Sequence, residues 1–443
     1  MKKKVLGLLI ALCLLIALVP VVMIQQAYAA VTTATVTLFG TSVTIDTDET
    51  TTDIPEVLYW VNGEDGALPV AATATDNWNY RFSIVANIPT VTIRDANYKH
   101  TATFLKATFD GSLKLAYEGA NTFFVPYKAS SGYAFISYGS TTTNSAGKGH
   151  LYLEAADGAY LNVTGGSKGV TMLGLSNKAY LTITGGTIHM ERTNAGGVNG
   201  VLSVPYGKVA ITNCNLNIKD LTAVSGKHPL VSIGNGKSYG LTITDSNVTL
   251  ESNAYLTLCM GVFQSNMNGV LYNAFLTVNG NSNLTVINAS NNTGSTREYN
   301  GIGIWASTVN IKGGSVEVEA PLEAIHLTVA DSAPNLADYE GVYEMFTAKD
   351  GSPAASYDVT DYFRVGAPGS TPSITKPSET TKPSETTKPA ETTKPAETTK
   401  PAETQPGTIN PPTGDNGIAM FVALMAIAMF GIVATVAFGK KHA

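Results

Sequence analysis

Cysteine and charged side chains are scarce in this chain of 443 residues. Of its three cysteines, Cys13 lies in an apolar N-terminal run, so Cys214 and Cys259 are the one conceivable pair in the middle of the chain. A scaffold stapled by several disulfides is therefore excluded, and we expect two unpaired thiols in or beside the core. Residues 30–365 carry 18 basic and 28 acidic side chains, a net charge of −10. This charge disfavours nucleic acid or an anionic polymer as an electrostatic partner.

Helical periodicity and the usual catalytic motifs are missing from the same region. No stretch of it keeps an apolar period of 3.6 residues over three turns. It also lacks an HxH pair, a Gly-x-Ser-x-Gly elbow and a Cys/His constellation. Arg192 and Arg297 are the only arginines between residues 95 and 360, and we expect neither in a repeated strand. A lyase would need such a basic group at its site, so catalysis is disfavoured.

What the region does contain is a loose repeat in which two short alternating runs flank a turn pair. Copies begin at Leu161, Leu181, Val209, Leu241, Leu276 and Val309, which are 20, 28, 32, 35 and 33 residues apart. Inward Leu, Ile and Val alternate with outward Thr, Asn and Lys, so each run buries one face. A unit this small buries that face only by stacking on its neighbours.

These repeats predict an all-β fold with a parallel β-helix over residues 86–330. The pattern resembles the right-handed, pectate-lyase-like solenoids. A pair of β-sandwich domains is the alternative, because the repeat spacing is irregular. The open strand edges of a solenoid must be covered at both ends. We expect an N-terminal β cap or small β domain at 30–85 and a C-terminal cap at the tyrosine- and phenylalanine-rich residues 331–365.

The N-terminus reads as an export signal. Three lysines are followed by an apolar run, and the small residues Ala27 and Ala29 then suit a signal peptidase pocket. Residues 1–29 are therefore predicted to be a signal peptide cut after Ala29. An uncleaved membrane anchor is the alternative.

The C-terminus reads as an anchor. The uncharged run 418–438 would span ~31 Å as a helix, which matches a bilayer core, and Lys440 and Lys441 follow it. Just before this run stands Asn410-Pro411-Pro412-Thr413-Gly414, in which proline disfavours helix and keeps the peptide extended.

This arrangement over residues 410–443 resembles the LPxTG-like sorting signal of sortase-anchored surface proteins of Gram-positive bacteria. The resemblance implies that a sortase cuts between Thr413 and Gly414 and joins Thr413 to peptidoglycan. Before sorting, the helix would hold the chain in the membrane. Most of the family has Leu where this chain has Asn410, which leaves the sortase class open. The implied location is the cell surface, covalently attached to the wall.

A low-complexity segment precedes the motif. Lys376 to Pro406 reads "KPSETTKPSETTKPAETTKPAETTKPAETQP", with five lysines balancing five glutamates. Lacking large apolar side chains, residues 366–409 are predicted to be a disordered linker. Its prolines favour extended conformations at ~3.1 Å per residue, so it would serve as a spacer.

Candidate functional residues are few. Glu317 and Glu319 in "SVEVEA" would lie ~6.8 Å apart on one strand face, a separation that suits an inverting glycosidase. Trp60 and Trp78 are candidates for stacking on sugar rings, whereas Trp305 sits among alternating isoleucines and is expected to be packed.

No cofactor is expected. Calcium is conceivable at the acids Asp46, Asp48, Asp53 and Glu56, although their spacing matches no known loop. We therefore expect a surface protein that acts in adhesion or carbohydrate binding without catalysis, with a polysaccharide or a host or matrix molecule as ligand. A wall-displayed polysaccharide lyase or hydrolase and a structural surface coat are the alternatives.

Overall fold

The computed structural model describes residues 34–45, 57–64, 67–72, 77–125, 132–141, 149–165, 170–176, 178–193, 200–222, 229–234, 239–264, 269–271, 274–290, 301–328, 332–350 and 352–370. All of them belong to one compact unit, residues 1–376. The predicted signal peptide, sorting signal and helix 418–438, and most of the predicted linker, lie outside the described residues. Within that described part no helix is long and apolar enough to cross a membrane.

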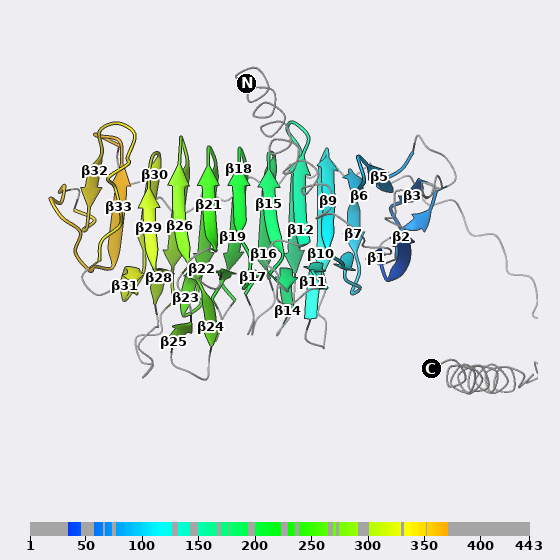
Figure 1. Cartoon of the computed structure of the whole chain (residues 1–443), viewed down its shortest axis with the longest axis horizontal. Coiled ribbons are helices and arrows are strands. Elements are labelled where there is room, and N and C mark those ends of the chain that lie inside the picture. The colour runs from blue at the N-terminus through cyan, green and yellow to red at the C-terminus, as the bar shows by residue number, and fades with distance from the viewer. Residues whose placement is uncertain are drawn as a thin grey trace, which may run out of the picture. The chain divides into compact units, whose positions relative to one another are not determined.

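The described chain is all-β, and its strands form three large sheets, A, B and C (Figure 1). Sheet A has the order β2 (Thr41–Ile45), β1 (Ala34–Leu38), β8 (Leu105–Thr108), β11 (Gly132–Gly139), β14 (Val170–Ser176), β17 (Leu202–Val204), β20 (Val231–Ile233), β23 (Leu256–Met260), β28 (Ile302–Ala306), β31 (Glu323–Leu327). Sheet B has the order β29 (Thr308–Ile311), β26 (Phe275–Asn279), β21 (Gly240–Thr244), β18 (Val209–Thr212), β15 (Tyr180–Thr184), β12 (Gly149–Ala155), β9 (Gly111–Glu118), β6 (Ile88–Arg94), β5 (Tyr80–Val85), β3 (Leu58–Val61), β4 (Val70–Ala71). Sheet C has the order β32 (Glu344–Phe346), β33 (Tyr362–Gly366), β30 (Ser315–Glu319), β27 (Asn283–Asn288), β22 (Asn247–Ser252), β19 (Asn215–Asp220), β16 (Thr187–Arg192), β13 (Tyr160–Gly165), β10 (Ala120–Val125), β7 (Asn97–Lys99). A small ribbon pairs β24 (Val262–Gln264) with β25 (Gly269–Leu271).

Successive strands visit the three sheets in turn, and each pairs in parallel with the strand one turn earlier and one turn later. Thus β12, β15 and β18 follow one another in sheet B, while β13, β16 and β19 do so in sheet C. The all-β prediction is confirmed, and the parallel sheets are compatible with a β-helix. They are not those of a β-sandwich, whose sheets are antiparallel.

The strand register shows that one of the repeat starts predicted from the sequence was assigned to the wrong row. Leu181, Val209, Leu241, Leu276 and Val309 occupy one row of sheet B, as predicted. The member of that row before Leu181, however, is Leu151, which pairs with Leu181 and with the still earlier Leu113. Leu161 belongs to sheet C, where it pairs with Ile188. The apparent first spacing of 20 residues is therefore a strand-to-strand step, and the true one, from Leu151, is 30 residues.

Tight corners join sheet B to sheet C, and the backbone conformation of each corner decides which residue types occur there. Asn213 and Asp245 take positive φ values of 51° and 48°, a conformation that Asn and Asp tolerate better than most residues. The Asp245 carboxylate accepts a hydrogen bond from the Asn281 amide of the next turn at 3.0 Å. A Cβ on Gly280 would lie 2.3 Å from that same carboxylate oxygen, so glycine is required there.

Different pairing closes the two ends of the stack. At the start, β1 and β2 pair antiparallel in sheet A, and β3, β4 and β5 pair antiparallel in sheet B. At the end, β33 runs antiparallel to both β30 and β32.

The interior is filled by stacked rows of apolar side chains. Near the N-terminal end, aromatic rings replace the aliphatic ones, and Phe104 stacks on Phe135 with ring centroids 5.4 Å apart. Cys214 and Cys259 are free and buried, which confirms the expectation of unpaired thiols. Burial raises the pKa of the Cys214 thiol to about 12. Both cysteines therefore act as small apolar residues.

Candidate functional site

The two tryptophans proposed to stack on sugars are buried instead. Trp60 is 9% exposed and packs edge-on against Phe39, with ring centroids 5.7 Å apart. Trp78 is 7% exposed, and the guanidinium groups of Arg81 and Arg94 lie 4.9 and 4.3 Å from its ring centroid. Neither indole offers an open face, so the stacking role assigned to them is wrong. Trp60 lies in β3, which pairs antiparallel with β4 and β5, and Trp78 stands just before β5, an arrangement that no local sequence pattern reveals.

Trp305 is packed, as expected. It is 6% exposed and forms a small buried cluster with Leu256, Cys259 and Ile302. The His326 ring lies 4.1 Å from it.

The two carboxylates proposed as a catalytic pair have different surroundings. Glu317 is only 6% exposed and accepts a hydrogen bond from the Tyr362 hydroxyl at 2.9 Å. The Glu319 side chain is 30% exposed and forms an ion pair with Lys349. Glu317 lines a pocket that Glu319 does not reach. They are therefore not arranged as two equally accessible carboxylates, because β33 covers the strand that was expected to be open.

Aromatic side chains that the sequence reading passed over gather on the outer face of sheet B. In β12, buried Leu151 and Leu153 alternate with the partly exposed His150 and Tyr152. The His150 and Tyr152 rings stack at 4.0 Å with an interplanar angle of 14°. On the neighbouring strand, Tyr180 meets His150 edge-on at 6.0 Å. We name these three residues the sheet-B aromatic patch.

Polar contacts fix the rings of the sheet-B aromatic patch. His150 Nε2 and Thr182 Oγ1 are 2.8 Å apart, and the Lys208 ammonium lies 5.7 Å from the Tyr180 ring centroid. Partial burial lowers the pKa of His150, which favours the neutral imidazole. A neutral, hydrogen-bonded imidazole stacked on tyrosine forms a flat and uncharged platform.

The row that holds His150 and Tyr180 continues along the sheet. The register places Lys208 beside Tyr180, then Gly240, and then Phe275. A Cβ on Gly240 would lie 2.8 Å from the Phe275 ring, so that ring leans over the glycine. Partly exposed rings therefore recur along the outer face of sheet B from β12 to β26.

The pocket beside Glu317 lies near the C-terminal end of the stack and has a volume of about 550 Å³. Its base comes from the corners and strand starts of sheet C, at Asn281, Asn283 and Ser315. The segment from Tyr339 to Val342 and the segment from Arg364 to Ser370 supply the walls. The Tyr339 hydroxyl donates to the Gly314 carbonyl at 2.6 Å, which ties one wall to the base.

Arg364 is the cation of this pocket and is only 3% exposed. Its guanidinium carbon lies 5.0 Å from the Phe346 ring centroid, and Nη2 donates to the Ser370 hydroxyl at 2.6 Å. Its other terminal nitrogen, Nη1, has no hydrogen-bond partner. Arg364 and Glu317 are directly opposite across β30 and β33, yet they form no ion pair among the described contacts.

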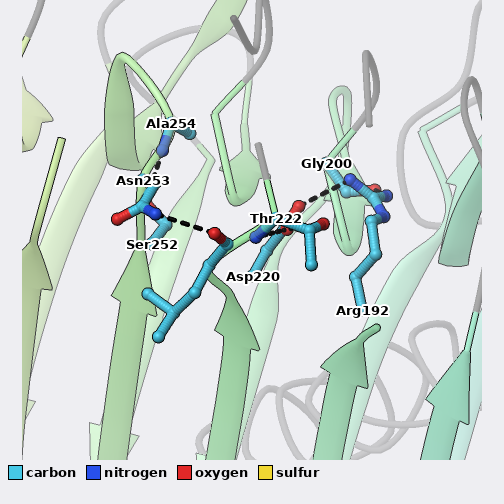
Figure 2. A network of polar contacts seen from close by, with 8 residues as sticks. Arg192, Gly200, Asp220, Thr222, Ser252, Asn253 and Ala254 are labelled. Atoms are coloured by element: carbon cyan, nitrogen blue, oxygen red, sulfur yellow. Dashed lines mark hydrogen bonds and ion pairs between the residues drawn. The ribbon is translucent and has the colours of Figure 1, made fainter. Parts of the chain in front are cut away.

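A buried polar column lies at the corner where sheet C strands end, and Figure 2 shows part of it. Arg192 closes β16, so the expectation that it lies outside the repeated strands is wrong. Arg192 Nη1 lies 2.7 Å from Asp220 Oδ2, and both side chains are at most 4% exposed. Asp220 also accepts hydrogen bonds from the Thr222 amide and hydroxyl at 3.1 and 2.8 Å.

The column continues with Ser252 and Asn288 on the next strands. Ser252 Oγ accepts from the Ala254 amide at 3.3 Å, and Asn288 Nδ2 donates to the Ala254 carbonyl at 2.9 Å. Since these groups satisfy the backbone of the corners, the column has a structural role.

Within the described ranges, no three His, Cys, Asp or Glu residues are grouped as metal ligands. The calcium candidates Asp46, Asp48, Asp53 and Glu56 lie outside those ranges, as do Arg297, Ala27, Ala29 and residues 410–414.

Of the two sites that the sequence did not predict, the sheet-B aromatic patch had a signal in the sequence. The run "GHLYLEA" alternates aromatic with apolar residues, which was enough to place His150 and Tyr152 on one outer face. The pocket had no such signal, because Glu317 and Arg364 are 47 positions apart and meet only through the pairing of β33.

Comparisons with protein-family models, with curated proteins and with solved structures found no match for this chain.

Proposed function

We propose that this protein is a cell-surface protein that binds polysaccharide without cleaving it, and that the sheet-B aromatic patch is its contact surface. The observation that carries this proposal is the set of partly exposed, ordered rings of His150, Tyr152 and Tyr180. Aromatic side chains present an apolar face together with a polar edge, which suits a sugar ring with its hydroxyl groups.

The surrounding surface supports a neutral, extended ligand. Next to the patch, Thr182, Ala210, Thr242 and Thr277 form a row across neighbouring strands of sheet B. Successive residues of such a row lie ~4.8 Å apart, which is the spacing of strands in a sheet. The threonine hydroxyls of this row, which Ala210 interrupts, can both donate to and accept from the hydroxyls of a polymer that lies along the stack.

A non-catalytic role is supported by the separation of Glu317 from Glu319. One is covered and bonded to Tyr362, and the other is paired with Lys349. No observation favours the lyase or hydrolase alternative at these residues.

The finer architecture and the location belong to the same proposal. We infer that the three parallel sheets wind as a right-handed β-helix with antiparallel caps, because crossovers between parallel strands are right-handed in nearly all proteins. We also propose secretion through residues 1–29 and attachment to peptidoglycan through the sortase motif 410–414, with residues 366–409 as the spacer. The support for these parts is the sequence resemblance alone.

Binding by displayed protein tests the function. Gram-positive cells displaying the full chain would be incubated with labelled plant, mucin and bacterial polysaccharides, with and without calcium, and polymer length would be followed. We expect saturable binding of at least one polymer, no shortening, and about 3- to 10-fold weaker binding for Tyr180→Ala.

The matched control is Tyr255→Ala, a partly exposed tyrosine at another corner, which should bind as the wild type does. Shortened polymer would overturn the non-catalytic proposal. Equal binding by Tyr180→Ala and wild-type cells would remove the sheet-B aromatic patch as the contact surface.

A further inference from the structure

We propose that the C-terminal pocket is a second binding site, and that it takes the acetamido group of an N-acetylated hexosamine. The inference rests on the proposed function in assuming a saccharide ligand, but the site is separate from the sheet-B aromatic patch. Its volume of about 550 Å³ falls within the range of small-molecule sites, ~300–1,000 Å³.

The first argument is the unpaired donor. Arg364 is only 3% exposed. Its Nη2 donates a hydrogen bond to Ser370, whereas its Nη1 has no hydrogen-bond acceptor. A buried N–H without an acceptor is costly, and a charged one more so. Because Nη1 itself has almost no accessible surface, a ligand acceptor would bond it only after the guanidinium turns toward the pocket, and that bond would recover this cost.

The second argument is charge. Arg364 is the single cation among the lining residues, whereas Glu317 and Glu340 are both anionic. A ligand carboxylate would gain one cation but would share the pocket with the two carboxylates of its lining. A neutral group that accepts and donates at neighbouring atoms fits better. An amide does so, with its carbonyl toward Arg364 and its N–H toward a carboxylate such as that of Glu317.

The third argument is the apolar part of the lining. The Val342 side chain lines the pocket and is 76% exposed. The methyl of an acetamido group would cover it, and the Tyr339 ring, also in the lining, would contact the sugar ring. Asn281 and Ser315 would then face the sugar hydroxyls.

Residues of the C-terminal closure hold the side chains of Arg364 and Glu317. The Ser370 carbonyl and hydroxyl hold Arg364 Nη2, and the Tyr362 hydroxyl holds Glu317 Oε1. Each group is therefore held by a partner other than its cross-strand neighbour, and both residues line the pocket.

Calorimetric titration of the full chain in a sugar-free detergent tests this inference. The probes are N-acetylglucosamine, N-acetylgalactosamine, glucosamine, glucose, glucuronate and acetyl-glutamine amide. We expect binding of an N-acetylated sugar, and at least tenfold weaker binding of glucosamine and glucose. Arg364→Lys, which keeps the charge but loses the forked donor, should weaken binding about tenfold or more.

A variant at an exposed position guards against misfolding. Val342→Trp fills the pocket mouth and should abolish binding, whereas Val359→Trp, at a residue 64% exposed outside the lining, should not. The inference is overturned if no N-acetylated sugar binds, if glucuronate or the glutamine amide binds more tightly, or if Val342→Trp binds normally. Loss of binding in Tyr180→Ala with retention in Val342→Trp would assign the sugar to the sheet-B aromatic patch, leaving the proposed function intact.

Discussion

His150 occupies an outer-face position of sheet B, in the row that continues with Tyr180, Lys208, Gly240 and Phe275. It stacks on Tyr152 and contacts Thr182 and Tyr180, and this partial burial lowers its pKa. The unfolded chain therefore takes up a proton at this residue more readily than the folded one. The stability from neutral His150 is present above the unfolded pKa of ~6.5 and is lost as the pH falls below it.

We therefore expect the thermal midpoint of the wild type to fall between pH 7.5 and pH 5.5, and to fall less in His150→Gln. Differential scanning calorimetry at both pH values measures this. All the other ionisable groups are common to both proteins, so their contributions cancel in the comparison. Equal pH dependence in the two proteins would contradict the prediction.

Residue roles could be predicted from the sequence only where the neighbours along the strand decide them. Alternation placed Val316 and Val318 inward correctly, and both are fully buried. The same rule placed Glu317 outward but could not foresee that β33 and Tyr362 would cover it. Trp60 and Trp78 failed for a related reason, since Trp60 joins the core through contacts such as that with Phe39, and Arg94 covers the Trp78 ring from another strand.

The strands of sheet C offer a clear test at the scale of the element, because two ion pairs cross between neighbouring strands there. Arg192 and Asp220 join β16 to β19 inside the corner, whereas Lys219 and Glu251 join β19 to β22 on the outer face. Removing Asp220 would leave a buried guanidinium without its anion. We expect Asp220→Leu to lower the free energy of unfolding by about 3–5 kcal/mol.

Urea-induced unfolding followed by circular dichroism measures the effect. Glu251→Gln is the matched control and should cost ~1 kcal/mol or less, because that pair is partly exposed. Arg192→Met combined with Asp220→Leu should recover part of the loss. If Asp220→Leu costs no more than Glu251→Gln, the column does not stabilise the corners.

Strand pairs joined by tight corners were predictable, and strands reached through long segments were not. The five later sheet B to sheet C units were found because one short turn keeps both runs adjacent in sequence. The sheet A strands β17 and β20 are only three residues long and follow segments of varying length, so no period marks them. That variation also explains the irregular spacing that made a β-sandwich conceivable.

At the scale of the whole molecule, the expected wall anchor makes a prediction that is independent of the fold. If a sortase reads the motif, wild-type protein should leave the cell only after digestion of the wall. Thr413→Ala should shift the protein to the membrane and medium fractions, because the Thr413–Gly414 bond, whose threonine carbonyl would be transferred to the wall, is no longer recognised. Fractionation and immunoblotting of the source cell measure this.

Thr408→Ala, just outside the pentapeptide, is the control and should stay in the wall. An unchanged location for Thr413→Ala, together with absence from the wall fraction, would reject sortase anchoring. Sorting signals of this kind can be predicted from sequence because they are short linear motifs. The sequence predicted that both ends of the stack must be covered, because unpaired strand edges are exposed there. It did not predict how β1 to β5, β32 and β33 pair to cover them.

Each turn of the described stack meets only the turn before it and the turn after it, and the B-to-C corners repeat in register. Whole turns could therefore be duplicated or lost in evolution with little disturbance to the rest. Every added turn would lengthen the outer faces by ~4.8 Å and leave both terminal closures in place. A gene lineage could in this way change the length of the outer faces while keeping the contacts between neighbouring turns.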